Sequence, residues 1–181
     1  MCLPSRRTGL QSIRRDYLDS HLADHVKDFS GVVVDVGGYP NGRRGQFRPQ
    51  SYDDLDWLFL NLDPQSGAEI IASACEMPLE DSSCDHIICT EVLEYIEDPI
   101  VAIGEMERIL KPGGTGIASI PFLHAVHGDK EMDRVRYTKL GIEELFMRAG
   151  FSTRISPMGS IFSVIFDLGM VSFGYASEQK F

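Results

Sequence analysis

The sequence predicts an α/β domain with a Rossmann-like, doubly wound, mostly parallel sheet and helices on both faces. Short apolar runs alternate along the chain with segments of helical periodicity, which is typical of parallel strands joined by crossover helices. The run VVV at 32–34 is β-branched and continuous, as expected of a strand buried on both faces. The turn GGYPNG at 37–42 follows this strand directly, and its glycines allow a ligand to approach the backbone.

The first half of the chain is expected to hold one helix and three strands. Apolar residues recur at helical spacing from Leu10 to Phe29, within an N-terminal segment 1–29. Residues 39–54 are rich in glycine, proline and arginine and have no clear period, so we expect a loop with a single helical turn. The expected strands cover 31–36, 55–63 and 68–74.

The clearest helix of the sequence lies within 97–114, EDPIVAIGEMERILKPGG. Asp98 is the expected cap and Pro99 the first helical residue, where no amide donor is needed. Lys111 is expected in the last turn, before Pro112 ends the helix. The other expected elements are strands at 86–90, 115–121 and 151–158, and a helix at 138–150 with Thr138 as cap and Gly150 after its end.

The whole chain, 1–181, is expected to form a single domain. Its core is predicted at 31–157 and includes an irregular polar loop at 121–137. The apolar segment 158–181 is expected to be a last strand, or a helix that packs on the sheet or on a second copy in a homodimer. A membrane span is not expected there, because Asp167 interrupts a short apolar run.

Composition argues against several classes of partner. The net charge of −10 disfavours a nucleic acid, which is bound by neutralising phosphates with Lys and Arg. The arginines near the start, Arg14 and Arg15 among them, are expected on solvated polar faces. Four cysteines show neither metal-ligand spacing nor a disulfide framework, and no signal peptide is recognised, so we expect a cytoplasmic protein without a bound metal.

Polar or small residues follow four of the predicted strands at the point where each ends. In an open parallel sheet, ligands bind outside the carboxyl ends of the strands. A carboxylate there accepts hydrogen bonds from ribose hydroxyls, whereas it repels phosphate. The spacing of the glycines also differs from GxGxxG, so a nucleoside cofactor without phosphate is favoured. The residues concerned are Asp35, Gly37, Gly38, Asp63, Ala74, Cys75, Thr90 and Glu91. Glu91 has the alternative of capping a following helix.

These stretches resemble the class I S-adenosylmethionine-dependent methyltransferases, in particular the type 11-like group that acts on small molecules. VVVDVGG resembles the first motif of that family, which lines the methionine part of the cofactor. LNLD resembles the end of the second strand, which implies that Asp63 binds the ribose. EMERILKPGG, before the fifth strand, is the most specific piece. The stretch 120–151 is similar to a subgroup associated with sugars and glycans.

The resemblance implies that S-adenosylmethionine is the cofactor and that its methyl group is displaced in line by an acceptor. The cofactor supplies the reactivity, and the protein supplies orientation and electrostatics. If the nucleophile is a hydroxyl, a general base helps, and His127 or His124 in the loop after the fifth strand is the candidate. Arg136 and Tyr137 are candidates for holding a polar substrate, with an internal ion pair and packing as their alternatives.

Two other functions remain open from the sequence. The first is that the chain is not an enzyme but a catalytically degraded domain of the same fold that serves as a partner subunit. The altered glycine turn, and Ser73 where many members of the family have an aspartate, motivate this interpretation. A nicotinamide-dependent oxidoreductase is disfavoured because the GxGxxG pattern is missing.

Overall fold

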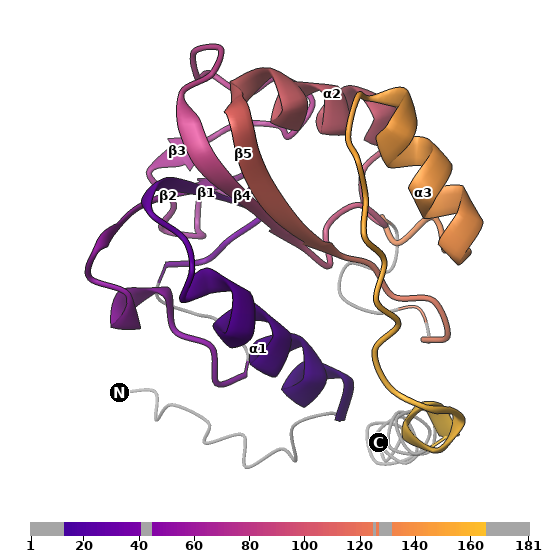
Figure 1. Cartoon of the computed structure of the whole chain (residues 1–181). Helices are drawn as coiled ribbons and strands as arrows, with labels where there is room; N and C mark the ends of the chain where they lie inside the picture. The colour runs from indigo at the N-terminus through magenta and orange to yellow at the C-terminus, as the bar shows by residue number, and fades with distance from the viewer. Residues whose placement is uncertain (1–12, 41–44, 125, 127–131, 166–181) are drawn as a thin grey trace, which may run out of the picture.

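The computed structural model describes residues 13–40, 45–124, 126 and 132–165, and these residues form a five-stranded sheet between two helical layers (Figure 1). The strands are β1 (Gly31–Val36), β2 (Leu55–Asn61), β3 (Ile70–Ile71), β4 (Cys84–Thr90) and β5 (Leu110–Ser119). Their order in the sheet is β3-β2-β1-β4-β5, and each neighbouring pair is parallel. The predicted doubly wound α/β fold is therefore confirmed.

Helices cover both faces of this sheet. Helix α1 (Ile13–Val26) lies on one face, and α2 (Pro99–Ile109) and α3 (Lys139–Arg148) lie on the other (Figure 1). The described part of the connection from β1 to β2 contains the single short turn expected there, the 3₁₀ helix η1 (Pro49–Ser51). We refer to the two sides of the sheet as the α1 face and the α2/α3 face.

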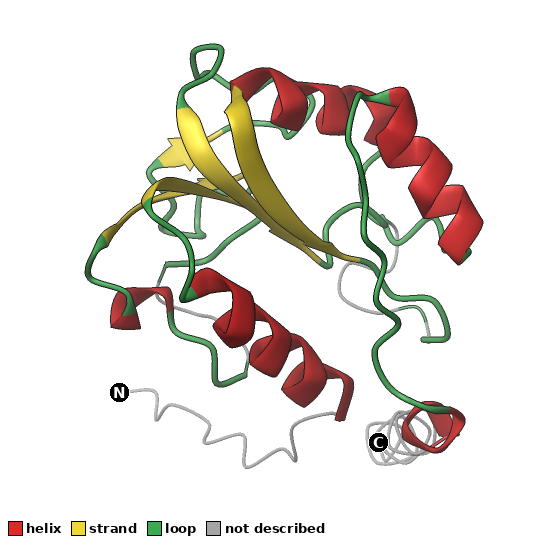
Figure 2. Cartoon of the chain, viewed as in Figure 1, coloured by secondary structure: helices red, strands yellow, loops and turns green. Residues whose placement is uncertain are grey.

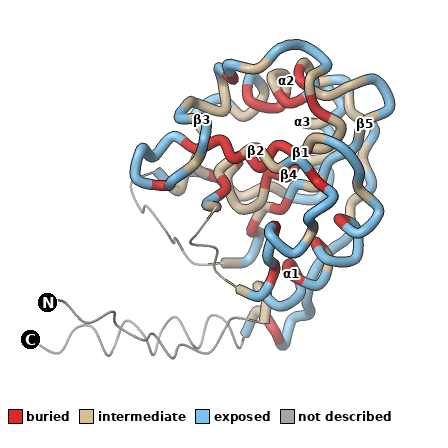
Figure 3. The backbone as a smooth tube through the Cα atoms, turned by 90° about the vertical axis from the view of Figure 1, so that its left-hand side faces the viewer, coloured by how far each residue is buried: buried red, intermediate tan, exposed pale blue. Residues whose placement is uncertain are grey.

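Each face has its own hydrophobic cluster, and the two meet at the buried central strands (Figure 3). Side chains alternate along each strand, so Val33 and Ile88 belong to the α1 face while Val34 and Ile87 belong to the α2/α3 face. The buried members on the α1 face are Leu18, Leu22, Val26, Val33, Phe47, Leu55 and Ile88. Those on the α2/α3 face are Val34, Val36, Leu60, Met77, Cys84, Ile87, Cys89, Leu93, Ile103, Met106, Ile109 and Leu145.

The sequence of α1 explains how it packs. Leu18, Leu22 and Val26 follow one another at intervals of four residues, and all three are almost completely buried against the sheet. This stripe fixes which side of α1 faces the strands.

Helix α2 begins as predicted and ends earlier. The Asp98 side chain accepts a hydrogen bond from the Val101 amide at 3.3 Å, and Pro99 is the first helical residue. The prediction that Lys111 lies in the last helical turn is wrong, because β5 already begins at Leu110. Leu110 pairs there with Cys84 of β4, and Lys111 Nζ lies 2.9 Å from both carboxylate oxygens of Asp85.

Helix α3 also has the predicted ends. Thr138 Oγ1 accepts a hydrogen bond from the Gly141 amide at 3.1 Å, and Gly150 follows the last turn with a φ of +94°. The sixth strand predicted at 151–158 is wrong, because that segment pairs with no described strand (Figure 2). Phe151 is held instead against Phe146, with ring centroids 5.7 Å apart.

The C-terminal segment was predicted to be either a strand or a helix, and its described part contains a helix. Residues 161–165 are helical, and a reciprocal pair of serines begins that helix: Ser163 Oγ accepts from the Ser160 amide at 2.8 Å. Residues 166–181 lie outside the described part of the chain. Across the ranges that the structure describes, every helix is too short or too polar to cross a bilayer.

Candidate functional site

The carboxyl ends of the parallel strands lie along one edge of the sheet. From β1 the chain continues outward to β2 and β3, and from β4 it continues in the opposite direction to β5. The topology therefore switches direction between β1 and β4, which is where open α/β sheets bind their ligands. The predicted site residues of β1 and β4 flank this point.

The glycine turn after β1 is held tightly at the switch point. The Gly37 amide donates to the Leu60 carbonyl oxygen at 2.7 Å, and the Gly37 φ is +76°. A Cβ atom at Gly37 would lie 2.3 Å from Cγ2 of Val92, directly after the β4 tip. Only glycine satisfies both conditions, so the backbone of this turn passes close to the end of β4.

Asp35 lies beneath the turn. It is only 1% exposed, and a Cβ atom at Gly38 would lie 2.5 Å from its Cγ. Asn61, a residue that the sequence analysis did not select, donates from Nδ2 to the Gly38 carbonyl oxygen at 2.9 Å. Asp35 and Asn61 thus support the turn from the α1 face, to which strand alternation directs both side chains.

Asp63 is exposed beyond the end of β2. Its Oδ1 accepts from the Gln65 amide at 2.8 Å, and its own amide donates to Asn61 Oδ1 at 2.9 Å. These bonds fix the carboxylate in a turn at the rim of the edge, where a ligand can reach it.

The β3 tip joins the site to α2. Cys75 and Ala74 are both half-buried, and the Cys75 amide donates to Ser73 Oγ at 3.1 Å. The Cys75 thiol donates to the Asp98 carbonyl oxygen at 3.6 Å, at the start of α2. The structure therefore brings both residues to the same edge as Asp63.

The β4 tip has an unusual backbone. Glu91 adopts a φ of +58°, a conformation that costs a non-glycine residue about 1 kcal/mol or more and is concentrated at functional sites. Its amide donates to the Ser119 carbonyl oxygen, and its Oε1 accepts from Ser119 Oγ, both at 2.9 Å. Residues 91–95 form turns rather than a helix, so Glu91 does not act as a helix cap. Thr90, half-buried, precedes it.

Arg14 also reaches the β4 tip, which the sequence analysis did not foresee. Its Nη1 forms an ion pair with Glu91 Oε2, and the Arg14 side chain is only 27% exposed. The expectation that Arg14 lies on a solvated face is therefore wrong. Arg15, next to it, is likewise mostly covered and lies 3.6 Å from Asp19 Oδ1 through its Nε. The signal that was available is spacing, because Arg14 precedes Leu18 by one helical turn.

A second charged group lies beside the loop after β5. Glu94 is completely buried, and burial raises the pKa of its carboxyl to about 7. The Arg134 amide donates to the Glu94 carbonyl oxygen at 2.9 Å. Arg136 is hydrogen-bonded through both terminal nitrogens to the buried Asp133, which raises the pKa of the guanidinium.

The predicted substrate and catalytic residues have mixed outcomes. Arg136 and Tyr137 both make internal contacts, the first with Asp133 and the second with the cluster on the α2/α3 face. His124 is half-buried in the loop that follows β5. His127 lies outside the described residues. The roles of all four in binding or catalysis stay predictions.

A hollow of about 540 Å³ lies elsewhere, between α1 and the segment before β2. It is lined by Asp16, Asp19, Ser20, Ala23, Gln46, Phe47, Arg48, Ser51 and Tyr52. None of these residues lies at the carboxyl end of a strand, where the predicted site residues are. The hollow is therefore not the candidate site.

Comparison with known proteins gives likenesses in sequence and in fold. Residues 59–118 match a family model described as a methyltransferase domain. An uncharacterized methyltransferase of Mycobacterium sp. (strain JLS) is 27% identical over 116 residues, which cover 59% of this chain and 45% of that protein. The chain spans about half the length, or less, of the curated relatives it matches.

Two solved structures share the fold. The [4+2]-cyclase SpnF superposes with a TM-score of 0.69 at 19% identity, covering 91% of this chain and 67% of that one. A phosphoethanolamine N-methyltransferase of Haemonchus contortus, solved with S-adenosyl-L-methionine, superposes with a TM-score of 0.64 at 16% identity, covering 91% and 44%. At these identities the likeness concerns the fold.

Proposed function

We propose that this chain, whose core is a class I S-adenosylmethionine-dependent methyltransferase domain, transfers the methyl group of that cofactor to a small-molecule acceptor. The observation that carries the proposal is the glycine turn at the switch point, held against the β4 tip and flanked by Asp63 and Glu91. A fold of this kind hosts more than one reaction, so the proposal rests on the site rather than on the fold.

The residues at the strand tips fit the cofactor. A Cβ atom at Gly37 or Gly38 would collide with neighbouring side chains, so glycine is required at both positions and the turn has no side chain there. We expect this backbone to contact the methionine part of the cofactor, with Asp35 positioning the turn from below. We expect the exposed Asp63 to accept hydrogen bonds from the ribose hydroxyls. When bound, the cofactor supplies an electrophilic methyl group on a sulfonium.

The charges at this edge favour such a cofactor over a dinucleotide. Asp35, Asp63 and Glu91 place three carboxylates at the ends of β1, β2 and β4. They attract the sulfonium and ammonium groups and repel a pyrophosphate. The glycines also lack the spacing that holds a pyrophosphate.

The acceptor is expected to enter beside the loop after β5. Holding acceptor and methyl in line can supply roughly 7–11 kcal/mol of the barrier reduction. His124 is the described candidate for a general base, and an alcohol acceptor would need one. The finer proposal of a sugar or glycan precursor rests only on the resemblance of residues 120–151.

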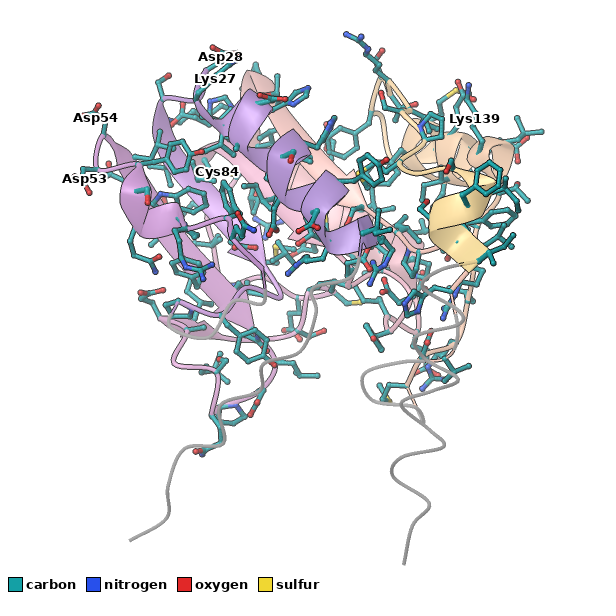
Figure 4. All side chains as sticks on the ribbon, turned by 90° about the horizontal axis from the view of Figure 1, so that it is seen from below. Lys27, Asp28, Asp53, Asp54, Cys84 and Lys139 are labelled. Carbon is teal, nitrogen blue, oxygen red and sulfur yellow. The ribbon has the colours of Figure 1, made fainter. Side chains whose placement is uncertain are left out.

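Titration with S-adenosylhomocysteine tests the proposal. Two variants carry the same substitution, Asp to Asn, one before and one after strand β2. Asp63 follows the carboxyl end of the strand, while Asp54 precedes its amino end and is also exposed (Figure 4). We expect D63N to weaken binding about tenfold or more, because hydrogen bonds to a charged group are strong, and D54N to leave it unchanged.

Failure of the wild-type chain to bind at millimolar ligand would overturn the proposal. Binding without methyl transfer to any of a panel of amines, alcohols and carboxylic acids would instead favour the alternative of a partner subunit that keeps the cofactor. Transfer is measured with S-adenosylmethionine labelled at the methyl group.

A further inference from the structure

We propose that Arg14 of α1 binds the carboxylate of the methionine part of the cofactor, so that the N-terminal helix forms a wall of the site. This inference rests on the proposed function and adds a binding residue to it. The juxtaposition that carries it is an α1 guanidinium at the β4 tip, next to the glycine turn.

The position of Arg14 follows from the packing of α1. Leu18, Leu22 and Val26 bury one stripe of the helix against the sheet, and Arg14 continues this stripe by one turn toward the helix start. A residue at that place faces the strands rather than solvent. The ion pair with Glu91 shows where the side chain ends, at the carboxyl edge of β4.

The neighbouring groups place this guanidinium beside the tips of β4 and β5, close to the switch point. Glu91 immediately precedes Val92, the residue against which Gly37 packs. Glu91 is also bonded to Ser119 at the tip of β5. Strand alternation turns the Ser119 side chain to the α1 face, together with Asp35. Arg14 therefore stands on the side of the sheet to which the strand-tip acids are directed.

Charge complementarity identifies the ligand group. The methionine part of the cofactor carries an ammonium and a carboxylate, and the acids at this edge suit only the ammonium. A carboxylate among Asp35, Asp63 and Glu91 requires a cation, and a guanidinium binds carboxylates in a planar, two-bonded geometry. Its five donors allow it to serve two carboxylates, so pairing with Glu91 and with the ligand is compatible.

Arg136 is another arginine near this edge, and it is less suitable. Both of its terminal nitrogens are bonded to Asp133, whose side chain is completely buried. Recruiting Arg136 would leave a buried carboxylate without its partner, which is costly. Arg14 pairs with a half-buried carboxylate whose neighbour Ser119 keeps a hydrogen bond to it.

The test compares two ligands that differ in the carboxylate alone: S-adenosylmethionine and its decarboxylated analogue, which keeps the sulfonium and the amine. Calorimetric titrations are made with the wild-type chain, R14Q, R14K and R15Q. The last is a matched control, because Arg15 lies on the same helix and contacts Asp19 instead of the strand tips.

We expect R14Q to bind S-adenosylmethionine about 10- to 100-fold more weakly, as for other charge-assisted pairs, and the analogue within about threefold of wild type. R15Q should change neither affinity. R14K keeps the charge without the fork, so it should lose affinity for S-adenosylmethionine by less than R14Q and keep its affinity for the analogue. It covers the case in which R14Q does not fold, which thermal unfolding would reveal.

Equal losses for the two ligands in both Arg14 variants would overturn the inference, since a purely structural role through Glu91 cannot distinguish them. Equal affinities of R14Q and wild type for S-adenosylmethionine would overturn it as well. If the wild-type chain binds neither ligand, the proposed function itself fails. That outcome is visible before any variant is compared.

Discussion

The two faces of the sheet are covered to different extents. On the α2/α3 face, two helices and the chain around them bury twelve hydrophobic residues among those described. On the α1 face, one helix and the segment around Phe47 bury seven, counted over the same described ranges. Within this part of the chain, the thinner cover lies on the face to which Asp35, Asn61 and Ser119 are directed.

We infer from this difference that the two faces contribute differently to stability and to ligand binding. The α2/α3 face is built largely from residues close in sequence, since β4, α2 and β5 follow one another and pack together. The α1 face joins a helix from the start of the chain to strand tips that lie far away in sequence, through the Arg14–Glu91 ion pair. Stability is expected to depend mostly on the first face and ligand binding mostly on the second.

Two matched core truncations test this division most strongly. Ile103 on the α2/α3 face and Leu22 on the α1 face are both completely buried. We expect I103A to lower the free energy of unfolding by about 3–5 kcal/mol and L22A by about 2–3 kcal/mol, because a single covering helix can shift to fill part of the cavity. Urea unfolding measures both values.

Ligand affinity in the same two variants tests the difference between the two faces. L22A should also weaken binding of S-adenosylhomocysteine, because it loosens the helix that carries Arg14, whereas folded I103A should bind normally. A larger loss of affinity in I103A than in L22A would contradict the division between the faces.

A buried acid offers a smaller, pH-dependent test on the α2/α3 side. Burial raises the pKa of Glu94 from 4.5 to about 7 in the folded chain, and Arg136, Asp133 and Arg14 are the charged groups around it. Between these two values the unfolded chain is ionised and the folded chain retains the proton. The fold is therefore favoured at low pH and loses this contribution as the pH rises through 7.

The substitution E94Q removes this titration. Relative to E94Q, the wild-type chain should lose up to about 3 kcal/mol of stability between pH 4.5 and pH 7.5, since each pH unit corresponds to about 1.4 kcal/mol. Urea midpoints at the two values measure the effect. The neighbouring Glu97 is exposed, so E97Q should follow the wild-type profile, and a wild-type profile in E94Q would refute the assignment.

Local signals predicted much of the fold. The β-branched run of β1, the Asp98–Pro99 start of α2 and the Thr138 cap of α3 each act within a few residues, so their patterns are visible in the sequence. The expected strand at 68–74 shortened to two residues, because only Ile70 and Ile71 find partners on β2. Helical spacing alone could not reveal that Lys111 binds Asp85.

The site was predictable to a similar extent. Residues at strand ends could be selected because parallel strands bring their carboxyl ends to one edge. Asn61 could not, because it acts on Gly38, more than twenty residues away, and helical spacing directs Arg14 toward the sheet without revealing its partner Glu91. The contacts of these two side chains form only when the folded sheet brings their partners beside them.

The smallest expected effect concerns the weakest part of the α2/α3 layer. Helix α3 has only Leu145 as a buried residue, so its position depends more than that of α2 on its ends. Thr138 caps it directly after the segment that carries Arg136. We expect T138A to lower the free energy of unfolding by about 1 kcal/mol, the usual cost of losing a cap, and T138S to retain nearly all of it.

The same variant, T138A, also tests whether stability and ligand affinity change independently in the α2/α3 layer. Because Thr138 acts on α3 rather than on the strand tips, T138A should leave the affinity for S-adenosylhomocysteine within about twofold of wild type while the urea midpoint falls by the equivalent of about 1 kcal/mol. A drop in affinity equal to that of L22A would mean that the loop before α3 is coupled to the edge of the sheet where the strands end. In that case the α2/α3 layer would take part in binding, and the contrast between the faces would no longer hold.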